Sequence, residues 1–528
     1  MPKKFNVTGL CLPNQHYMAD ISEKLHTIIS DYIQTGKYFT INRARQYGKT
    51  TTLYLLEQML KNDYRVIRLS FEAADEMFVS RNTLAQGLIR KISRILKLQN
   101  TPPALIQSWN QPISAQFPID DLGERITELC CDSDKKIVLM IDEVDKSSDN
   151  QVFLSFLGLL RNKYLEMMQE NDRTFHSVIL AGVYDIKNLK LKLHPEEIPK
   201  YNSPWNIASD FTVDMSLSPS EIATMLLDYE KDYHTGMDIS AISRLIYDYT
   251  SGYPYLVSRI CQLTDERLAG SADFPSRPDA WSLTGITGAE KLLRKESGPL
   301  FDDINKKLAD YPDLKHILQN ILFHGKRYPF EKDVPLIQLG MTLGFLKEKE
   351  GFLAIENRIF ETKLYDLFLA ESAASYDKIY QIGSMERNQY FVNGTLQMRL
   401  VMEKFYRHFT KIYRDNDQKF IEDQGRKIFL LYLQPIINGA GNYYIESQTR
   451  DLKRTDIIVD YKGVQSVIEL KIWHGKEYNQ RGIRQLFEYL DYYKTDTGYL
   501  LSFNFNKNKK TGIQEISYHG KRIMEVVV

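Results

Sequence analysis

A short segment near the amino terminus, Gly48-Lys49-Thr50, has the residue types of a phosphate-binding loop. Glycine lets backbone N–H groups approach a phosphate, and a helix that begins there turns its positive end toward the anion. The Lys49 ammonium would reach the β- and γ-phosphates of a nucleotide, and the Thr50 hydroxyl would hold Mg²⁺. Arg43 replaces the first glycine of the pattern GxxxxGK, so the loop departs from the full motif. The segment nevertheless predicts a site for a nucleoside triphosphate with Mg²⁺.

Two acids, Asp142 and Glu143, follow an apolar run at residues 136–141. Moving a charge out of water is costly, so paired acids at the end of a buried strand indicate a function. The carboxyl end of such a strand borders the crevice in which open α/β sheets bind ligands. Asp142 would bind Mg²⁺, directly or through water, and Glu143 would polarise the attacking water. The alternative is a strand end whose two acids are simply solvated.

A second group of charged residues lies near the carboxyl terminus and consists of Asp456, Glu469 and Lys471. Alternation along a strand puts Glu469 and Lys471 on one face and Leu470 on the other. Asp456 and Glu469 would bind Mg²⁺ or Mn²⁺, because hard oxygen ligands select such metals, and Lys471 would orient or deprotonate a water. These residue types suit metal-assisted cleavage of a phosphodiester. Two alternatives stay open: a solvated charged strand face, and a nuclease fold without activity.

Alternating strands and helices must position the first of these two groups. Apolar or β-branched runs alternate with stretches of helical spacing through the first half of the chain. This order predicts an α/β fold with a parallel sheet covered on both faces. The predicted strands are residues 39–41, 66–70, 136–141 and 177–181, and the predicted helices are residues 49–60 and 84–96.

The second half of the chain has a different organisation. Short helices and a two-strand turn at residues 347–351 predict a winged-helix-like module, whose mixed charges favour a packing role over contact with DNA. A polar linker and a second α/β domain follow; the domain's predicted helices are residues 396–413, 420–433 and 483–493, and its predicted strands are residues 443–446, 456–460, 467–472 and 498–503. The predicted domains are residues 1–265, 266–370 and 396–528, with a linker at residues 371–395.

Composition sets the class of protein. The 528 residues are 43% hydrophobic and 26% charged, which excludes a chain that is mainly disordered. Lys+Arg and Asp+Glu balance at 68 each, so any contact with nucleic acid must come from a local patch. Four cysteines do not make a disulfide scaffold, and we find neither a signal peptide nor an apolar run long enough to cross a membrane. We therefore expect a cytoplasmic protein with no membrane partner.

The amino-terminal motifs resemble those of prokaryotic AAA-like ATPases, close to the STAND branch of P-loop ATPases. Members share an Arg-Gln-x-Gly-Lys-Thr-Thr loop after a strand, matched here at residues 45–51, and often lack the first glycine. The resemblance implies ATP as the nucleotide. It also implies that Pro254, in a Gly-x-Pro-x-Leu motif, packs against the base and that Tyr17 lies near the adenine. The loop residues that it assigns to ATP are Arg45, Gln46, Gly48, Lys49, Thr50 and Thr51.

The carboxy-terminal motifs resemble the PD-(D/E)xK nuclease superfamily, whose fold is restriction-endonuclease-like. An acid, a spacer and then Glu-x-Lys in a strand are met by Asp456, Glu469 and Lys471. The superfamily often adds a carboxylate from a preceding helix, for which Glu422 fits best. It also often adds a Gln-x-x-x-Tyr element on the next helix, which Gln485 begins. The resemblance implies a nuclease site in which Gln485 contacts phosphate.

Together the two resemblances imply an ATPase whose nucleotide state controls a metal-dependent nuclease. The expected cofactors are ATP and Mg²⁺, with Mg²⁺ or Mn²⁺ at the nuclease site. The expected partner is nucleic acid, with DNA favoured over RNA, and the sequence leaves a homo-oligomer open. The alternative function is an ATP-driven regulatory or assembly switch in which the nuclease-like fold only binds nucleic acid or a partner.

Overall fold

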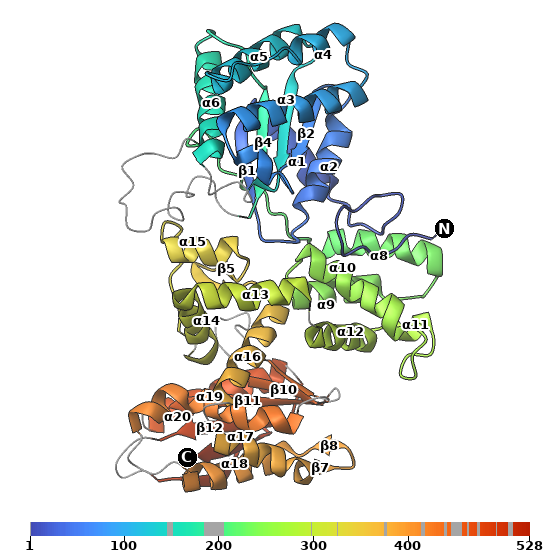
Figure 1. Ribbon diagram of the computed structural model, residues 1–528. Helices are drawn as coiled ribbons and strands as arrows, with labels where there is room; N and C mark the ends of the chain where they lie inside the picture. The colour runs from blue at the N-terminus through green and yellow to red at the C-terminus, as the bar shows by residue number, and fades with distance from the viewer. Residues whose placement is uncertain are drawn as a thin grey trace. The chain divides into compact units, whose positions relative to one another are not determined.

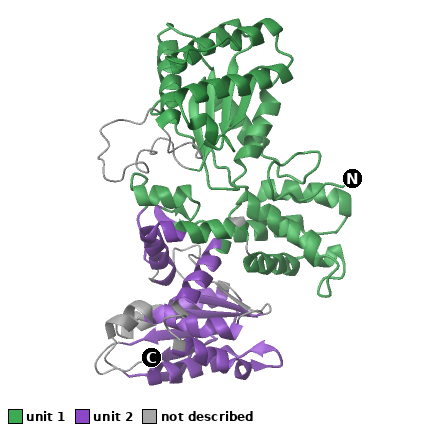
Figure 2. Cartoon of the chain, in the orientation of Figure 1, with its two compact units in different colours: residues 1–307, 330–350, 354–359 green, residues 308–329, 351–353, 360–528 purple. Residues whose placement is uncertain are grey.

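The computed structural model divides the chain into two compact units (Figures 1 and 2). Unit 1 comprises residues 1–307, 330–350 and 354–359, and unit 2 comprises residues 308–329, 351–353 and 360–528. The structure describes residues 2–144, 151–183, 205–296, 298–324, 326–373, 377–412, 418–437, 441–444, 457–461, 464–472, 476–492, 494–504 and 510–528. Among these residues, no helix is both long enough and apolar enough to span a membrane.

Unit 1 is built on a four-stranded parallel sheet in the order β1-β4-β3-β2. Every residue of β3 and β4 is buried, because helices cover both faces of the sheet and leave no polar side. The prediction of an α/β fold with a parallel sheet is therefore confirmed. The strands are β1 (Tyr38–Asn42), β2 (Arg65–Ser70), β3 (Ile137–Asp142) and β4 (Ser177–Gly182).

Helices pack on this sheet and continue beyond it. The Ser80 side chain caps the helix α3, accepting a hydrogen bond from the backbone N–H of Thr83. The helices on the sheet are α1 (Ser22–Ile28), α2 (Lys49–Leu60), α3 (Arg81–Leu98), α4 (Pro103–Trp109), α5 (Pro118–Asp132) and α6 (Gln151–Met168). Those that follow the sheet are α8 (Pro219–Tyr233), α9 (Ile239–Thr250), α10 (Pro254–Leu263), α11 (Arg277–Ala280), α12 (Leu283–Lys295) and α13 (Pro299–Asp310).

The middle of the chain contains the predicted two-strand turn. Strands β5 (Leu346–Lys349) and β6 (Phe352–Ile355) form a two-stranded sheet, flanked in the chain by α15 (Pro335–Thr342) and α16 (Arg358–Ala373). The helix α14 (Pro312–His324) precedes them. The winged-helix assignment and the domain boundaries remain predictions.

Unit 2 holds a six-stranded sheet in the order β13-β14-β12-β11-β10-β9. Strands β11, β12 and β14 are parallel to one another, whereas β9, β10 and β13 each run antiparallel to a neighbour. The strands are β9 (Gly441–Tyr444), β10 (Ile457–Tyr461), β11 (Val464–Ile472), β12 (Thr497–Phe503), β13 (Gly512–Tyr518) and β14 (Lys521–Val527).

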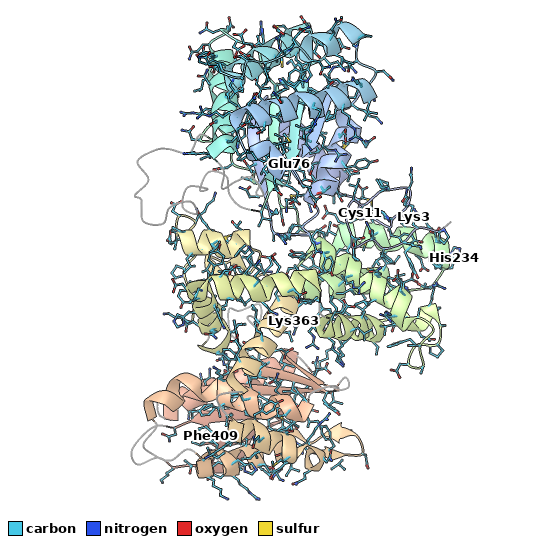
Figure 3. The ribbon with its side chains drawn as sticks, in the orientation of Figure 1. Lys3, Cys11, Glu76, His234, Lys363 and Phe409 are labelled. Carbon is cyan, nitrogen blue, oxygen red and sulfur yellow. The ribbon has the colours of Figure 1, made fainter. Side chains whose placement is uncertain are left out.

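Helices lie on both faces of the unit 2 sheet. Leu486 and Leu490 of α20 (Lys476–Tyr492) pack with Val467 and Leu500 on one face. On the other face, Phe409 of α18 (Met398–Ile412; Figure 3) contacts the Phe503 ring at 5.5 Å. The helix α19 (Gln418–Ile437) precedes β9 in the chain.

The segment that we expected to be a linker contains a helix. Residues 377–385 form α17 (Asp377–Met385), which packs on α19. A Cβ at Gly383 would lie 2.4 Å from the Tyr432 carbonyl oxygen, so the two backbones approach closely only because residue 383 is glycine. A polar composition therefore did not indicate a free linker at these residues.

Candidate functional site

The phosphate-binding loop lies between β1 and α2. Gly48 caps α2 with a φ of 79°, a left-handed conformation that glycine adopts without strain. The residue two positions earlier, Gln46, has a φ of 59°. The chain thus makes a tight turn at the carboxyl end of β1 and places the first turn of α2 beside the loop.

Lys49 lies over this loop and is only 7% exposed. Its Nζ donates hydrogen bonds of 2.9 Å to the carbonyl oxygens of Arg43 and Ala44. These bonds replace the hydrogen bonds to water that the buried ammonium has lost, and they hold it at the loop. Lys49 can therefore meet an anion bound there.

Thr50 and Asp142 come together from the loop and from the end of β3. The Thr50 hydroxyl donates a 2.6 Å hydrogen bond to Asp142 Oδ2, and Asp142 is 4% exposed. A hydroxyl oxygen and a buried carboxylate are hard oxygen donors, and they fit Mg²⁺. The structure thus brings together the two residues that the sequence predicted as Mg²⁺ ligands.

Glu143 follows Asp142 in an unusual backbone conformation. Its φ is 58°, which costs a non-glycine residue of order 1–3 kcal/mol. Its backbone N–H donates to Asp142 Oδ1 at 3.0 Å. Glu143 lines the same polar cavity as Lys49 and Thr50. The strained backbone therefore belongs to the residue whose carboxylate was predicted to polarise water.

An apolar cavity adjoins the polar one. It is lined by residues that include Tyr17, Ile21, Met215 and Leu217. Gly48, Thr51 and Pro254 line both cavities, so the two meet at the loop. An apolar hollow beside a polar one suits a ligand with a flat base at one end and phosphates at the other.

The residues that the ATPase resemblance assigned to the base occupy this apolar cavity. The Tyr17 hydroxyl donates a 2.6 Å hydrogen bond to Asp232 Oδ2, and burial raises the pKa of Tyr17. Pro254 begins α10, and a Cβ at Gly48 would lie 3.9 Å from its ring. Both residues stand where a base would enter.

Arg45 and Gln46 line the polar cavity. Arg45 is exposed, and its Nη1 lies 3.6 Å from Asp303 Oδ1, while its carbonyl oxygen accepts a hydrogen bond from the Tyr253 hydroxyl. The loop is thus tied to α10 and α13 within unit 1.

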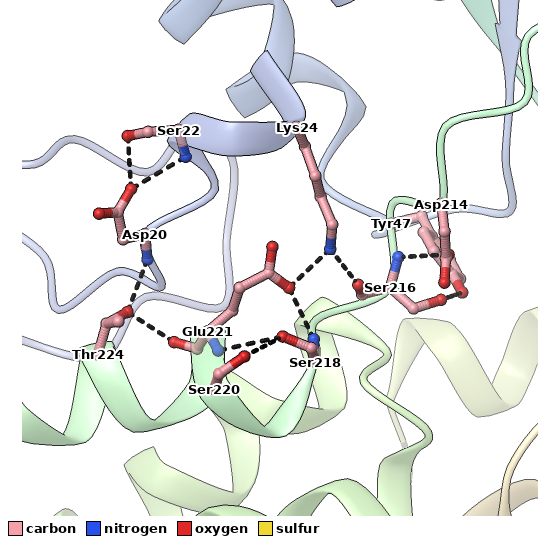
Figure 4. A network of polar contacts seen from close by, with 10 residues as sticks. All are labelled: Asp20, Ser22, Lys24, Tyr47, Asp214, Ser216, Ser218, Ser220, Glu221 and Thr224. Atoms are coloured by element: carbon pink, nitrogen blue, oxygen red, sulfur yellow. Dashed lines mark hydrogen bonds and ion pairs between the residues drawn. The ribbon is translucent and has the colours of Figure 1, made fainter. Parts of the chain in front are cut away.

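A buried contact that the sequence did not predict joins the loop to the region around β6. The Tyr47 hydroxyl bonds to Ser216 Oγ at 2.7 Å (Figure 4) and donates to Glu356 Oε1 at 3.2 Å. Glu356 is 8% exposed, so burial raises its pKa, and the Lys347 ammonium opposes that rise. A Cβ at Gly344 would lie 2.8 Å from Ala44 Cβ. No motif marked this contact, because 309 positions separate Tyr47 from Glu356.

In unit 2, Glu469 and Lys471 lie side by side on β11. Glu469 is fully buried, and Lys471 Nζ lies 2.7 Å from Glu469 Oε1. Lys471 Nζ also donates to Gln485 Oε1 at 3.2 Å, and Gln485 Nε2 donates to the Tyr489 hydroxyl at 3.0 Å. The structure therefore joins the predicted Glu-x-Lys and Gln-x-x-x-Tyr elements in one polar chain beneath α20.

Two other predicted members of this group cannot be placed. Asp456 lies outside the described residues, as does the side chain of Glu422. Among the described residues, no group of three or more His, Cys, Asp or Glu side chains is placed to hold a metal. Glu469 is a buried oxygen donor and fits a hard cation; Asp456 as a second ligand stays a prediction.

Two further polar residues share this face of the unit 2 sheet. Ser502 pairs with Lys471 across β11 and β12, and Glu525 lies opposite Leu500, which itself pairs with Glu469. Ser502 and Glu525 are both fully buried, and Glu525 accepts a hydrogen bond from Gln514 Nε2. Residues 523–528 are apolar apart from Glu525. This pattern did not indicate that Glu525 faces the same side of the sheet as Glu469.

Comparisons with known proteins identify no family for the chain. No family model matches the chain, and neither does any curated protein. A Walker-type ATPase of Pyrococcus abyssi is similar at 14% identity, over 68% of this chain and 99% of that one, with a TM-score of 0.45. The RuvB Holliday junction branch migration motor of Thermotoga maritima is similar at 12% identity, over 64% and 92%, with a TM-score of 0.31. At these values the likenesses carry no argument about function, which rests on the site itself.

Proposed function

We propose that unit 1 binds and hydrolyses ATP. The observation that carries this proposal is the Thr50–Asp142 hydrogen bond beside the buried Lys49, at the carboxyl edge of a parallel sheet. Lys49 would pair with the phosphates, and the apolar cavity at Tyr17 and Pro254 would take the base. Mg²⁺, when bound, would neutralise charge on the phosphates. Glu143 would accept a proton from the attacking water.

We further propose that unit 2 is a nuclease of the PD-(D/E)xK type. The chain order α19-β9-β10-β11-α20-β12 and the buried Glu469–Lys471 pair support this assignment. Ile457, the residue after Asp456, pairs with Ile468, the residue before Glu469, which favours a shared site for the two acids. Lys471 would orient the attacking water, and Gln485 would hold Lys471 in place.

The contact between Tyr47 and Glu356 supports control of one activity by the other. ATP can shift a conformational equilibrium only if it binds one arrangement better than another. Tyr47 lies inside the loop and Ala44 approaches Gly344 just before β5, so a change in loop position on ATP binding would reach Glu356 and the segment before β5. The alternative function, a switch whose nuclease-like fold only binds nucleic acid, predicts the same coupling without cleavage.

Metal removal separates the proposed function from that alternative. Purified protein should cleave plasmid or linear DNA in Mg²⁺ and should lose cleavage in EDTA, because the carboxylate site acts through a metal. ATP hydrolysis should also stop in EDTA. Cleavage that persists in EDTA would contradict the metal-dependent site. Hydrolysis without cleavage, on double-stranded or single-stranded DNA or on RNA, would favour the switch.

A further inference from the structure

The helix α3 carries a local excess of positive charge in a chain whose net charge is zero. No Asp or Glu occurs between Glu76 and Asp120. The same stretch contains five cations, all of them on α3: Arg81, Arg90, Lys91, Arg94 and Lys97. Such a stretch is the kind of local patch that an overall balanced composition conceals.

Three of these cations line a groove of about 770 Å³ on unit 1. Arg90, Arg94 and Lys97 stand at positions i, i+4 and i+7, so they share one face of the helix. The other residues that line the groove are uncharged and include Gln86, Asn110 and Gln111. The groove therefore carries three positive charges and no negative one.

These cations are available to a ligand. Arg90, Arg94 and Lys97 are all exposed, and none of them makes a hydrogen bond or an ion pair within the part of the chain that the structure describes. By contrast, the neighbouring Lys91 donates to the Ser70 carbonyl oxygen. Like charges one turn apart on a helix repel each other, and a bound anion would relieve that repulsion.

The walls of the groove are fixed before any ligand binds. Trp109, at the end of α4, is 1% exposed, and its Nε1 donates a 2.9 Å hydrogen bond to the Ile89 carbonyl oxygen of α3. Asn110 Nδ2 donates to Ser93 Oγ at 3.0 Å. These two bonds hold the segment after α4 against α3, so little ordering is needed on binding.

We propose that this groove binds the sugar–phosphate backbone of single-stranded nucleic acid. Guanidinium groups match phosphate oxygens in a fork, and the groove offers two of them in a row. About 6 Å of helix axis separates Arg90 from Arg94, and about 4.5 Å separates Arg94 from Lys97, which suits a ligand with repeated charges. The groove has the volume of a small-ligand pocket, which suits the entry of a single strand.

The chemistry of the groove also sets how it recognises its ligand. No aromatic side chain lines it, so it offers no platform on which bases could stack. Contacts to phosphate carry no sequence information. Binding should therefore be independent of sequence and strongly dependent on salt. This site is separate from the proposed nuclease centre, and it can be tested without cleavage.

Fluorescence anisotropy with a labelled oligo(dT) strand, in EDTA and without ATP, tests the proposal. The triple variant Arg90→Gln/Arg94→Gln/Lys97→Gln should lose affinity. Its plot of log K against log salt should be shallower by about 2, because three phosphate contacts on a single strand contribute about 0.7 each. The matched control is Lys231→Gln/Arg244→Gln/Arg267→Gln, which removes three exposed cations outside the groove. It should keep the wild-type affinity and slope.

Three results would overturn the proposal. The first is an unchanged slope in the groove variant, and the second is an equal loss in both triple variants, which would show only a response to net charge. The third is tighter binding of poly-glutamate than of oligo(dT), lost in the groove variant, which would assign the groove to an acidic protein segment. Arg90→Lys/Arg94→Lys keeps the charge and should retain the wild-type salt slope while it loses the part of the affinity that the guanidinium fork supplies, which guards against a folding defect.

Discussion

Glu469→Gln is expected to abolish metal-dependent cleavage, with a loss of at least about 10²-fold in rate. Glutamine keeps the shape of the side chain but removes the charge that would hold a cation. The carboxylate is fully buried, and the substitution would leave the ammonium of its Lys471 neighbour beside a neutral amide. A gel assay of labelled DNA in Mg²⁺ measures the loss.

Glu525→Gln is the matched control for this variant. Glu525 is equally buried and lies on the same sheet face, two strands away, and it accepts a hydrogen bond from Gln514 Nε2. The control should therefore cleave at close to the wild-type rate. Thermal unfolding of both variants should show a folded protein. Equal loss of cleavage in the two variants would mean that any change to a buried carboxylate on this face disables the unit.

Substitutions at the proposed ATP site should separate the binding of ATP from its hydrolysis. Lys49→Ala should remove most of the affinity for ATP, because it deletes the ammonium that is held over the loop. Glu143→Gln should keep that affinity and lower the rate of hydrolysis by about 10²–10⁴-fold, since only the proton acceptor is lost. Calorimetry and a phosphate-release assay measure the two quantities.

Glu76→Gln provides the control for Glu143→Gln. Glu76 is an exposed carboxylate in the short helix at Asp75–Phe78 (Figure 3), and it does not line the polar cavity. Hydrolysis should be unchanged in this variant. Undiminished ATP binding in Lys49→Ala would contradict the assignment of the loop, whatever the effect of Glu143→Gln.

The sequence predicts what short-range patterns determine. The runs 136–141 and 177–181 are apolar without interruption because both faces of the sheet are covered, so the parallel sheet could be predicted. Glu469 and Lys471 could be placed on one face by alternation alone. The meeting of Thr50 with Asp142 followed from their positions at the carboxyl ends of strands.

Contacts between distant segments were beyond these patterns. Tyr47 bonds to Glu356 although 309 positions of sequence separate them, and neither residue belongs to a periodic motif. The burial of Glu525 depends on which strand flanks β12, and chain order does not reveal that neighbour. The helix α20 begins at Lys476, whereas the sequence predicted a start at residue 483. The earlier start was not predicted because the first turns of the helix are polar and lack an apolar stripe. Polar groups that are satisfied by distant partners resemble solvated ones in a sequence.

We propose that ATP binding in unit 1 controls the activity of unit 2. The physical basis of this control is Tyr47, which lies in the phosphate-binding loop, lines the polar cavity and donates a hydrogen bond to Glu356. Loss of ATP affinity in Lys49→Ala should therefore change the activity that we propose for unit 2. ATP could either restrain or license cleavage, and the proposal requires only that it change the rate.

This coupling can be measured as the rate of DNA cleavage by wild type and by Lys49→Ala, each with saturating ATP and with none. We predict that ATP changes the wild-type rate and leaves the rate of Lys49→Ala unchanged. Equal rates under all four conditions would rule out this coupling and would show two independent activities joined in one chain.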